Sequence, residues 1–214
     1  FVSSIVRGLQ TNGILGCAKH FPGHGSTTKD SHFDLPIVKR TREELNDEEF
    51  KPFIKAIKSR VEFVMVAHLI VDSIDSELPT SLSAKSYEII RNELKHSKLI
   101  ITDDMEMKAI TDNFGVEEAA VKAVNAGADI VEYRSMEMAQ RALEALKEAK
   151  KTKVIKNDRF KESLSRIEEA KKEYLSEYKP VYIPDIAKKI NTGANQSLIA
   201  EIQEKIDEAK KAQA

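Results

Sequence analysis

The pattern of apolar and polar positions along this chain indicates short buried strands separated by longer amphipathic helices. Four nearly continuous apolar runs stand out: ILGCAKH (14–20), EFVMVAHL (62–69), KLIITDD (98–104) and ADIVEY (128–133). Continuous rather than alternating apolar runs are typical of parallel strands that are covered on both faces. We therefore predict four parallel strands, separated by roughly 30 to 45 residues as in successive βα units.

Helical spacing fills the intervals between these strands. In residues 43–58 the apolar positions form one stripe, and Pro52 predicts either a kink or a later start of that helix. Ser83 is suited to cap the following helix, and Glu117 suits the first turn of the one after that. Gly127 is expected at the end of this third helix.

The last third of the chain has a helical pattern throughout. Residues 136–150 predict a helix rich in Ala and Leu, and Asp158 is suited to cap a long helix after it. The segment YKPVYIPD (178–185) predicts an extended linker that contains proline, and 196–213 predict a final helix.

Polar side chains gather where the predicted strands end. Lys19 and His20 end the first strand, His68 lies at the end of the second, and Asp103 at the end of the third. Arg134 follows the fourth strand. Since α/β proteins build their sites at the carboxyl edge of a parallel sheet, we expect these side chains to share one site.

Composition limits the classes of function. With 34 basic and 35 acidic residues the formal net charge is −1, which gives no electrostatic reason to expect a nucleic acid partner. The single cysteine, Cys17, excludes an internal disulfide. No apolar run approaches the roughly 18 to 20 residues that span a bilayer, so we expect no membrane span. The chain begins inside a helical pattern without methionine, and we expect its natural N-terminus to lie upstream.

The segment KHFPGHGSTTKDSH (19–32) holds three of the five histidines and admits several chemistries. A metal site would use His20, His24, Asp30 and His32, but the proline and glycine between the first two exclude the helical geometry of common zinc motifs. A phosphate cradle is disfavoured because the segment matches neither glycine-rich phosphate-binding pattern.

The third interpretation of this segment is acid–base chemistry. Asp30 and His32 are two residues apart, so in an extended loop the carboxylate can orient the imidazole and raise its basicity. Asp103 is the best-placed carboxylate to act as their partner. The structural alternative makes Asp30 a turn residue, His32 a surface loop residue and Asp103 a helix cap. The residues alone leave these alternatives open.

The same segment resembles a known family. KHFPGHGSTTKDSHFDLP (19–36) is similar to the signature K-H-F-P-G-H-G-x4-D-S-H-x2-L-P of family 3 glycoside hydrolases of the β-N-acetylglucosaminidase type. The segments FKPFIKAI, VMVAHLIVDSID, LPTSLS, IITDDMEMKAI and AVKAVNAGADIVE follow in the order and rough spacing of that family. The resemblance spans about residues 5–175.

The resemblance implies roles for individual residues. In that family the aspartate in the place of Asp103 is the nucleophile of a glycosyl-enzyme intermediate. The histidine in the place of His32 is the general acid/base, and the aspartate in the place of Asp30 pairs with it. The residues in the places of Lys19 and His20 bind hydroxyl groups of the sugar.

The resemblance also implies an α/β fold, a (β/α)8 TIM barrel of which this chain holds about the last four βα units plus C-terminal helices. We expect the C-terminal half of the barrel in 1–150 and a barrel-flanking helix in 151–178. Residues 179–214 would form a linker and a helix leading toward a second domain. That domain and the first half of the barrel would lie outside this chain. His68 resembles a further substrate-binding residue of the pocket.

The implied function is that of a retaining exo-glycosidase. It would remove terminal β-N-acetylglucosamine from peptidoglycan-type or muropeptide-type glycans, without an organic cofactor or a metal. A β-N-acetylglucosaminide phosphorylase or another family 3 β-glycosidase is the alternative within the family. A non-catalytic metal- or carbohydrate-binding module is the alternative of another class. We expect little activity from the isolated chain, and the resemblance favours export from a bacterial cell over a cytoplasmic location.

Overall fold

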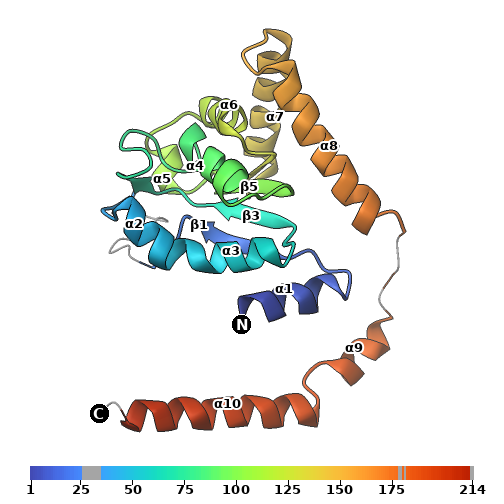
Figure 1. Ribbon diagram of the computed structural model, residues 1–214. Helices are drawn as coiled ribbons and strands as arrows, with labels where there is room; N and C mark the ends of the chain where they lie inside the picture. The colour runs from blue at the N-terminus through green and yellow to red at the C-terminus, as the bar shows by residue number, and fades with distance from the viewer. Residues whose placement is uncertain (26–34, 178–179, 181, 213–214) are drawn as a thin grey trace. The chain divides into compact units, whose positions relative to one another are not determined.

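Four parallel strands form the main sheet, in the order in which they occur along the chain (Figure 1). They are β1 (Cys17–Phe21), β3 (Phe63–Val66), β5 (Leu99–Asp104) and β6 (Ile130–Glu132). All pairings between neighbours are parallel, which confirms the four predicted strands. The computed structural model describes residues 1–25, 35–177, 180 and 182–212.

The strand order distinguishes a barrel from an open doubly wound sheet. Each βα unit adds its strand beside the previous one, and the described strands show no reversal of direction. A doubly wound sheet reverses its strand order at a switch point. A (β/α)8 barrel instead adds every strand on the same side. The sheet therefore has the arrangement of half a barrel, with β1 and β6 at its edges.

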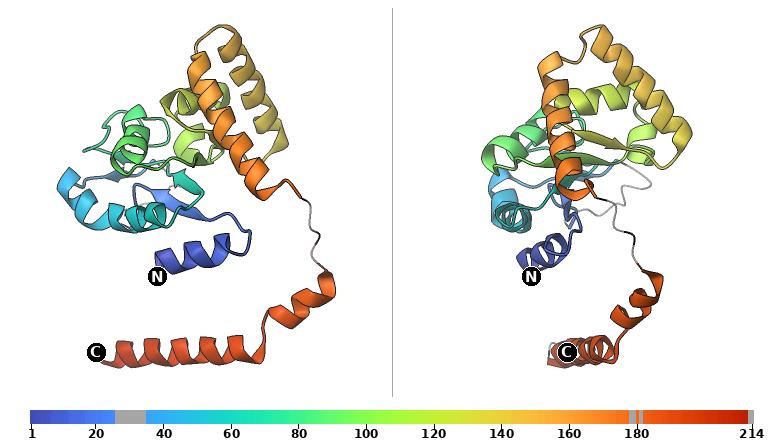
Figure 2. Two further views of the ribbon diagram at one scale, coloured as in Figure 1. Left: turned by 45° about the vertical axis from the view of Figure 1, so that its right-hand side comes forward. Right: turned by 90° about the vertical axis from the view of Figure 1, so that its right-hand side faces the viewer.

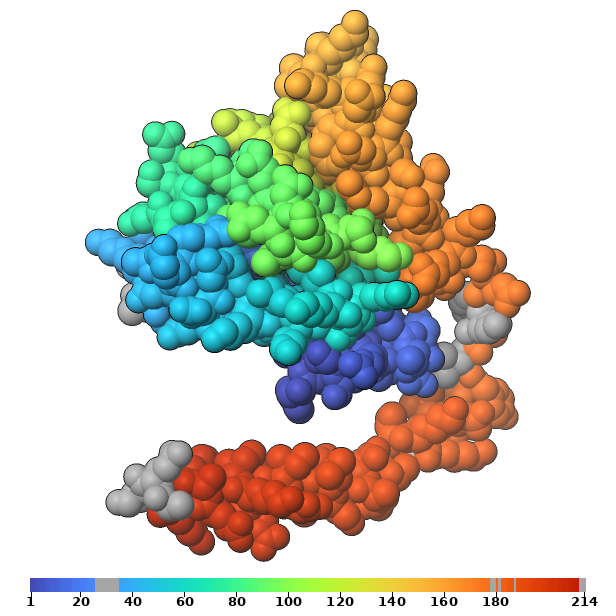
Figure 3. Space-filling model, in the orientation of Figure 1, coloured from blue at the N-terminus to red at the C-terminus, as the bar shows by residue number. Residues whose placement is uncertain are grey.

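Helices cover one face of this sheet and bury the core against it (Figure 2). Phe53, Tyr87 and Ala123, from three different helices, belong to one buried cluster with Val64 and Ile100 of the strands. The covering helices are α1 (Val2–Gln10), α3 (Phe50–Lys58), α4 (Ala84–Glu88) and α6 (Val116–Ala126). An ion pair between Arg42, before α3, and Glu93, after α4, joins the two helical segments that lie against each other in light blue and green in Figure 3.

The opposite face of the sheet is only partly covered. Successive side chains of a strand point to opposite faces, so this face carries Cys17 and Lys19 of β1 with Ile101 of β5 and Ile130 of β6. The two β1 residues are exposed, and both isoleucines are half-buried. This is the face that turns toward the interior in a complete barrel.

The predicted helix over 43–58 is one helical segment in three parts. It consists of α2 (Arg42–Glu44), a π-turn η1 (Leu45–Glu49) and α3 (Phe50–Lys58). Pro52 lies in the first turn of α3, where proline is tolerated, but the segment as a whole already begins at Arg42. A capping box formed by Thr41 and Glu44 begins the segment.

Two predicted caps are wrong in detail. Ser83 is at the N-cap position of α4, but its hydroxyl donates to the Asp75 carboxylate at 2.7 Å instead of accepting from the helix backbone. The helix α8 (Asn157–Tyr174) has Lys156 at its N-cap, which leaves Asp158 in the first turn. A tertiary partner replaces the local cap in the first case.

The remaining helices follow the predicted pattern with shifted ends. α7 spans Met136–Lys151, Glu117 lies in the first turn of α6, and Gly127 ends α6 with a φ of 140°. The predicted linker is shorter than expected, because α9 (Ile183–Lys189) begins within it with its proline in the first turn. α10 spans Gly193–Ala212.

The chain divides into two compact units, Phe1–Ser176 and Glu177–Ala214. The first unit holds the main sheet, a second sheet of β2 (Ile37–Val38) and β4 (Ile70–Val71), and every helix through α8. The second unit holds α9 and α10. Among the described residues, no helix combines the length and the apolar character needed to cross a membrane.

Candidate active site

Strand β1 loses its regular pairing at two candidate residues. Its register with β3 slips by one position between Ala18 and Phe21, the interval that contains Lys19 and His20. The peptide bonds Lys19–His20 and Phe21–Pro22 are both cis. A bulge of this kind changes the direction of side chains, and bulges are common beside active sites.

Strand β5 has the same irregularity at its own candidate residue. Its register with β6 slips by one position between Ile101 and Asp104, the interval that contains Asp103. The Asp103 side chain is 17% exposed, and its Oδ2 atom lies 3.6 Å from Nε2 of His20. Because β3 separates β1 from β5, the fold brings together two residues from strands that do not pair.

The neighbouring carboxylate, Asp104, is held by the loop that follows β5. Its Oδ2 atom pairs with Nε of Arg134 at 2.5 Å, and its Oδ1 atom accepts a hydrogen bond from the Glu106 backbone at 2.9 Å. Both oxygens of Asp104 therefore have protein partners. Among the described residues, Asp103 accepts one hydrogen bond, from the Asp104 backbone N–H to Oδ1 at 2.9 Å, and directs its other oxygen toward His20.

His68 lies at the same edge but below the surface. Its side chain is fully buried, with Nδ1 2.7 Å from the Ser81 hydroxyl and Nε2 3.0 Å from the backbone oxygen of Asp104. Because a carbonyl only accepts, Nε2 carries the proton and Ser81 donates to Nδ1. Burial lowers the pKa of His68, so the ring is neutral. In this structure His68 contacts the end of β5, not an open pocket where it would meet substrate.

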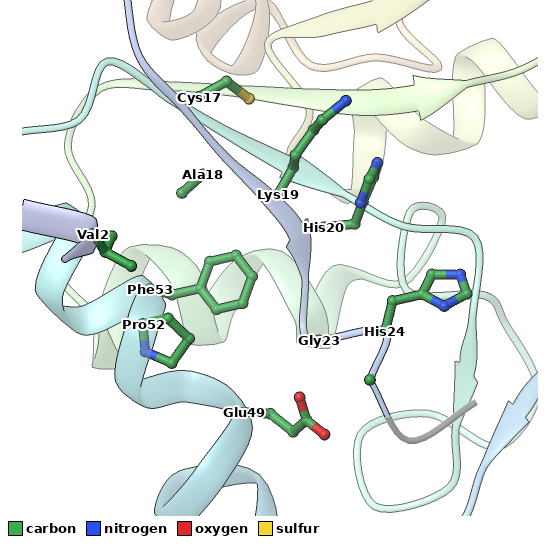
Figure 4. Close-up of a pocket in the computed structure, with 11 residues that line it drawn as sticks. Val2, Cys17, Ala18, Lys19, His20, Gly23, His24, Glu49, Pro52 and Phe53 are labelled. Atoms are coloured by element: carbon green, nitrogen blue, oxygen red, sulfur yellow. The ribbon is translucent and has the colours of Figure 1, made fainter. Parts of the chain in front are cut away.

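A hollow of about 450 Å³ lies beside β1 (Figure 4). Lys19 and His20 line it, but their side chains lie on the other side of β1 from Phe53 (Figure 4). Gly23 has a φ of 133°, and a Cβ atom there would approach the Cβ of Glu49 to 2.9 Å. Only glycine suits this turn, which leads the chain from β1 past His24 into the candidate loop.

The candidate acid–base pair, Asp30 and His32, lies outside the described residues. The described chain ends at Gly25 and resumes at 35, just before the short strand β2 (Ile37–Val38). This strand pairs in parallel with β4 (Ile70–Val71), directly beyond His68. In the part of the chain that the structure describes, no group of three or more His, Cys, Asp or Glu side chains is arranged to hold a metal ion.

Sequence reasoning missed two residues of this edge. Ser81 orients His68, and it lies in the LPTSLS segment, whose sequence gives no sign of that contact. Glu132 ends β6 opposite Asp104, and it was included in the predicted strand ADIVEY without a role. Side chains alternate between the two faces of a strand, and this alternation along β6 is the signal that assigns Glu132 to the open face.

Comparisons with known proteins show which family this chain resembles. A sequence profile described as "Glycosyl hydrolase family 3 N terminal domain" matches residues 1–170. The Beta-hexosaminidase of Idiomarina loihiensis is 35% identical over 129 residues, which cover 60% of this chain and 39% of that protein.

Two solved structures superpose on most of the chain. A glycoside hydrolase family 3 beta-N-acetylglucosaminidase from Paenibacillus sp. str. FPU-7 has a TM-score of 0.81 at 38% identity, over 84% of this chain and 35% of that one. The beta-glucoside phosphorylase BglX has a TM-score of 0.84 at 25% identity, over 94% and 38%. The chain thus spans less than half the length of each relative. With its four sequential βα units forming part of a TIM barrel, the chain belongs to glycoside hydrolase family 3.

Proposed function

We propose that this chain carries part of the active site of a retaining β-N-acetylglucosaminidase, with Asp103 as the nucleophile. One observation supports this assignment above the others. Of the two adjacent carboxylates that end β5, Asp104 has both oxygens engaged by the following loop, whereas Asp103 directs one oxygen toward His20. A nucleophile needs such an accessible lone pair at the carboxyl edge of the barrel.

The reaction takes two displacements at the anomeric carbon. In the first, a carboxylate oxygen of Asp103 bonds to that carbon while the bond to the aglycone oxygen breaks, and protonated His32 gives its proton to the departing oxygen. In the second, water attacks the same carbon and loses a proton to His32, and the Asp103 ester is released. The configuration of the sugar is therefore retained.

His32 takes the role that a second carboxylate has in most retaining glycosidases. An imidazole with an unperturbed pKa of about 6.5 both donates and accepts a proton near neutral pH. Asp30 stabilises its protonated form and fixes its tautomer. The described residues on either side of them are Gly25, next to His24, and the segment from residue 35 into β2, which pairs with β4 at the same edge. The ends of the loop are thus compatible with this role.

Lys19 and His20 bind hydroxyl groups of the terminal N-acetylglucosamine. Both lie in the bulge of β1, and Nε2 of His20 lies 3.6 Å from the proposed nucleophile Asp103. The substrates we propose are peptidoglycan-derived glycans with this sugar at the non-reducing end. His68, buried under Asp104, acts as a positioning residue for the end of β5.

A second candidate function is phosphorolysis. It is favoured by the structural likeness to a β-glucoside phosphorylase over 94% of this chain. A neutral imidazole base repels an incoming phosphate less than a carboxylate would, so the same residues suit either attacking group. Phosphate then replaces water in the second displacement, and a sugar 1-phosphate is released.

The test measures turnover of 4-nitrophenyl N-acetyl-β-glucosaminide by the complete protein that carries this sequence, with and without inorganic phosphate. We expect turnover that does not need phosphate, and a loss of at least about 1,000-fold in kcat/KM for Asp103→Ala. A slow fluorinated substrate should leave a sugar adduct on the peptide that contains Asp103. Full activity of Asp103→Ala would overturn the assignment, and strict dependence on phosphate would establish the phosphorylase.

A further inference from the structure

The carboxylate of Glu132 lies at the edge of the candidate site, and the proposed reaction does not use it. We infer that Glu132 is a specificity-determining residue that accepts a hydrogen bond from a donor group of the bound sugar and disfavours anionic sugars. This inference rests on the proposed function, because it assumes that the sugar binds at the carboxyl edge of the sheet.

The backbone of Glu132 is fixed at the level of the proposed nucleophile. Its Cα pairs with that of Asp104 across β5 and β6. Its N–H donates to the buried Thr102 hydroxyl at 3.2 Å, and its carbonyl accepts from the Met105 backbone at 2.9 Å. The end of β6 is therefore held on both sides of the Glu132 side chain.

The side chain of Glu132 belongs to the open face of the sheet. Val131, the residue before it, packs against the apolar clusters under the helices. Since side chains alternate along a strand, Glu132 points to the opposite face, which also carries Lys19. The charges of Asp103, Asp104 and Lys19 all act on the Glu132 carboxyl, as expected for neighbours at one edge.

Within the described residues, the Glu132 carboxylate makes no hydrogen bond or ion pair, although the residue is exposed to solvent. Two other carboxylates at this edge differ from Glu132, since Asp104 pairs with Arg134 and Glu106 accepts from the Ser135 backbone at 2.5 Å. Burial, reinforced by the negative charges of Asp103 and Asp104, raises the pKa of Glu132.

The Glu132 carboxylate has like charges beside it and no hydrogen-bond donor among the described protein residues. It is therefore well suited to accept a hydrogen bond from a donor on a bound ligand. Hydroxyl and amide N–H groups of a neutral sugar supply such donors, and a hydrogen bond to a charged acceptor is stronger than one between neutral groups. A carboxylate or phosphate on the sugar would instead add a negative charge to an edge that already holds the carboxylates of Asp103, Asp104 and Glu132. Glu132 thus favours neutral sugars with donors over anionic ones.

The test compares Glu132→Gln with Glu106→Gln in the complete protein. Both variants remove one negative charge from the same edge, but only the first changes a carboxylate without a protein partner. We expect Glu132→Gln to lower kcat/KM for the aryl N-acetyl-β-glucosaminide by about 10- to 100-fold and to weaken binding of N-acetylglucosamine by a similar factor. Glu106→Gln should change either quantity by less than about threefold.

Selectivity provides a second readout. Relative to N-acetylglucosamine, binding of N-acetylglucosamine 6-phosphate should improve by at least about 10-fold in Glu132→Gln. Thermal unfolding shows whether the variant is folded. Equal behaviour of the two variants in a folded, active protein would overturn the inference. If the wild-type protein binds the sugar without turning it over, the proposed function fails while the binding comparison still tests Glu132.

Discussion

The two ends of the sheet differ in how completely a key carboxylate is bonded within the protein. At the carboxyl end, Asp103 faces His20 at 3.6 Å and Glu132 has no protein partner among the described residues. At the amino end, Asp129 stands directly before β6 with a side chain that is fully buried. It pairs with three arginines, Arg91 at 2.5 Å, Arg159 at 2.9 Å and Arg166 at 3.0 Å.

The amino-end cluster is saturated with hydrogen bonds. Asp129 also accepts from the Ser163 hydroxyl at 2.7 Å and from the Ile100 backbone at 3.0 Å. Arg159 donates to the carbonyls of Val124, Gly127 and Ala128, where α6 ends, so the cluster ties α8 to the barrel.

This difference indicates that one end of the sheet contributes stability and that the other is suited to bind a ligand. Groups whose bonding capacity is used up inside the protein hold the elements together, whereas a binding site keeps donors and acceptors for its ligand. The same division holds in barrels generally, where the amino face contributes stability and the carboxyl face carries the site. Four substitutions, taken from the largest expected effect to the smallest, test whether this chain follows it.

Removing the central carboxylate of the amino end should have the largest effect. Asp129→Ala leaves three partly buried guanidinium groups without their anion, and we expect it to lower the free energy of unfolding by about 3 kcal/mol at pH 7. This figure is at the low end for a buried pair because the arginine side chains keep 16–24% exposure and are partly hydrated. Urea unfolding measures the change.

Asp103→Ala is the matched control at the carboxyl end. It also removes an aspartate, and the Asp103 side chain is 17% exposed, which is similar to the exposure of the three arginines that pair with Asp129. Unlike Asp129→Ala, it leaves no partly buried arginine without its anion. We expect a change of less than about 1 kcal/mol in the free energy of unfolding. Equal destabilisation by the two substitutions would contradict the division between the two ends.

Acid should weaken the amino end through His96. This buried ring donates from Nε2 to the Leu99 carbonyl at 3.0 Å, and burial lowers its pKa to about 4. Since the unfolded chain binds the proton near pH 6.5, stability is lost as pH falls from about 6.5 to 4, by roughly 2 kcal/mol at pH 5. Asp129 is protonated only at lower pH, because the nearby arginines outweigh the effect of burial and hold the pKa of its carboxyl below the ordinary value.

His96→Gln isolates this contribution, because the amide nitrogen of glutamine can replace Nε2 as the donor to Leu99. The variant's unfolding free energy at pH 8 gives the cost of the substitution itself. Between pH 8 and pH 5 the variant should lose about 2 kcal/mol less than the wild type. His68, whose pKa burial also lowers, accounts for an acid sensitivity that remains. Parallel pH profiles for variant and wild type would exclude His96 as the titrating group.

At the carboxyl end, Ser81→Ala should remove the hydrogen bond that orients the His68 ring. Loss of the hydroxyl leaves a buried ring nitrogen unsatisfied, at a cost of about 1–2 kcal/mol. Thr80→Val is the control, since the Thr80 hydroxyl is equally buried but donates to the Ala67 carbonyl at 2.7 Å. Nitrogen-15 NMR of the imidazole should show one Nε2–H tautomer in the wild type and in Thr80→Val. An unchanged His68 spectrum in Ser81→Ala would show that Ser81 does not orient the ring.

The smallest effect is expected on α8. Ser163→Ala removes one hydrogen bond to Asp129 and should cost about 1 kcal/mol. Ser165→Ala, two residues further on, removes an exposed bond to Glu169 at 3.2 Å and should cost less than about 0.5 kcal/mol. Chemical denaturation of both variants resolves the difference, and a larger loss from Ser165→Ala would place the stabilising contacts of α8 elsewhere.

The strands were predictable because continuous apolar runs report burial on both faces, which does not depend on the details of packing. Helix ends were less predictable, since a cap is a local option that tertiary partners can displace. Ser83 shows this, because its hydroxyl bonds to Asp75, a residue outside its own helix. The sequence does not predict the helix at Ile183, because its proline indicates a linker, although proline is also favourable in a first helical turn.

The sequence by itself determined which residues stand at the strand ends, because continuous apolar runs locate the ends, and the motif from Lys19 to His32 carries the resemblance to the family. Only the tertiary structure decided which partner each of these side chains contacts. Register slips in β1 and β5 bring His20 to Asp103, Arg134 occupies Asp104, and His68 turns inward to Ser81. The physical reason is that these contacts join segments far apart in the chain, and local patterns carry no record of which side chain a distant one will meet.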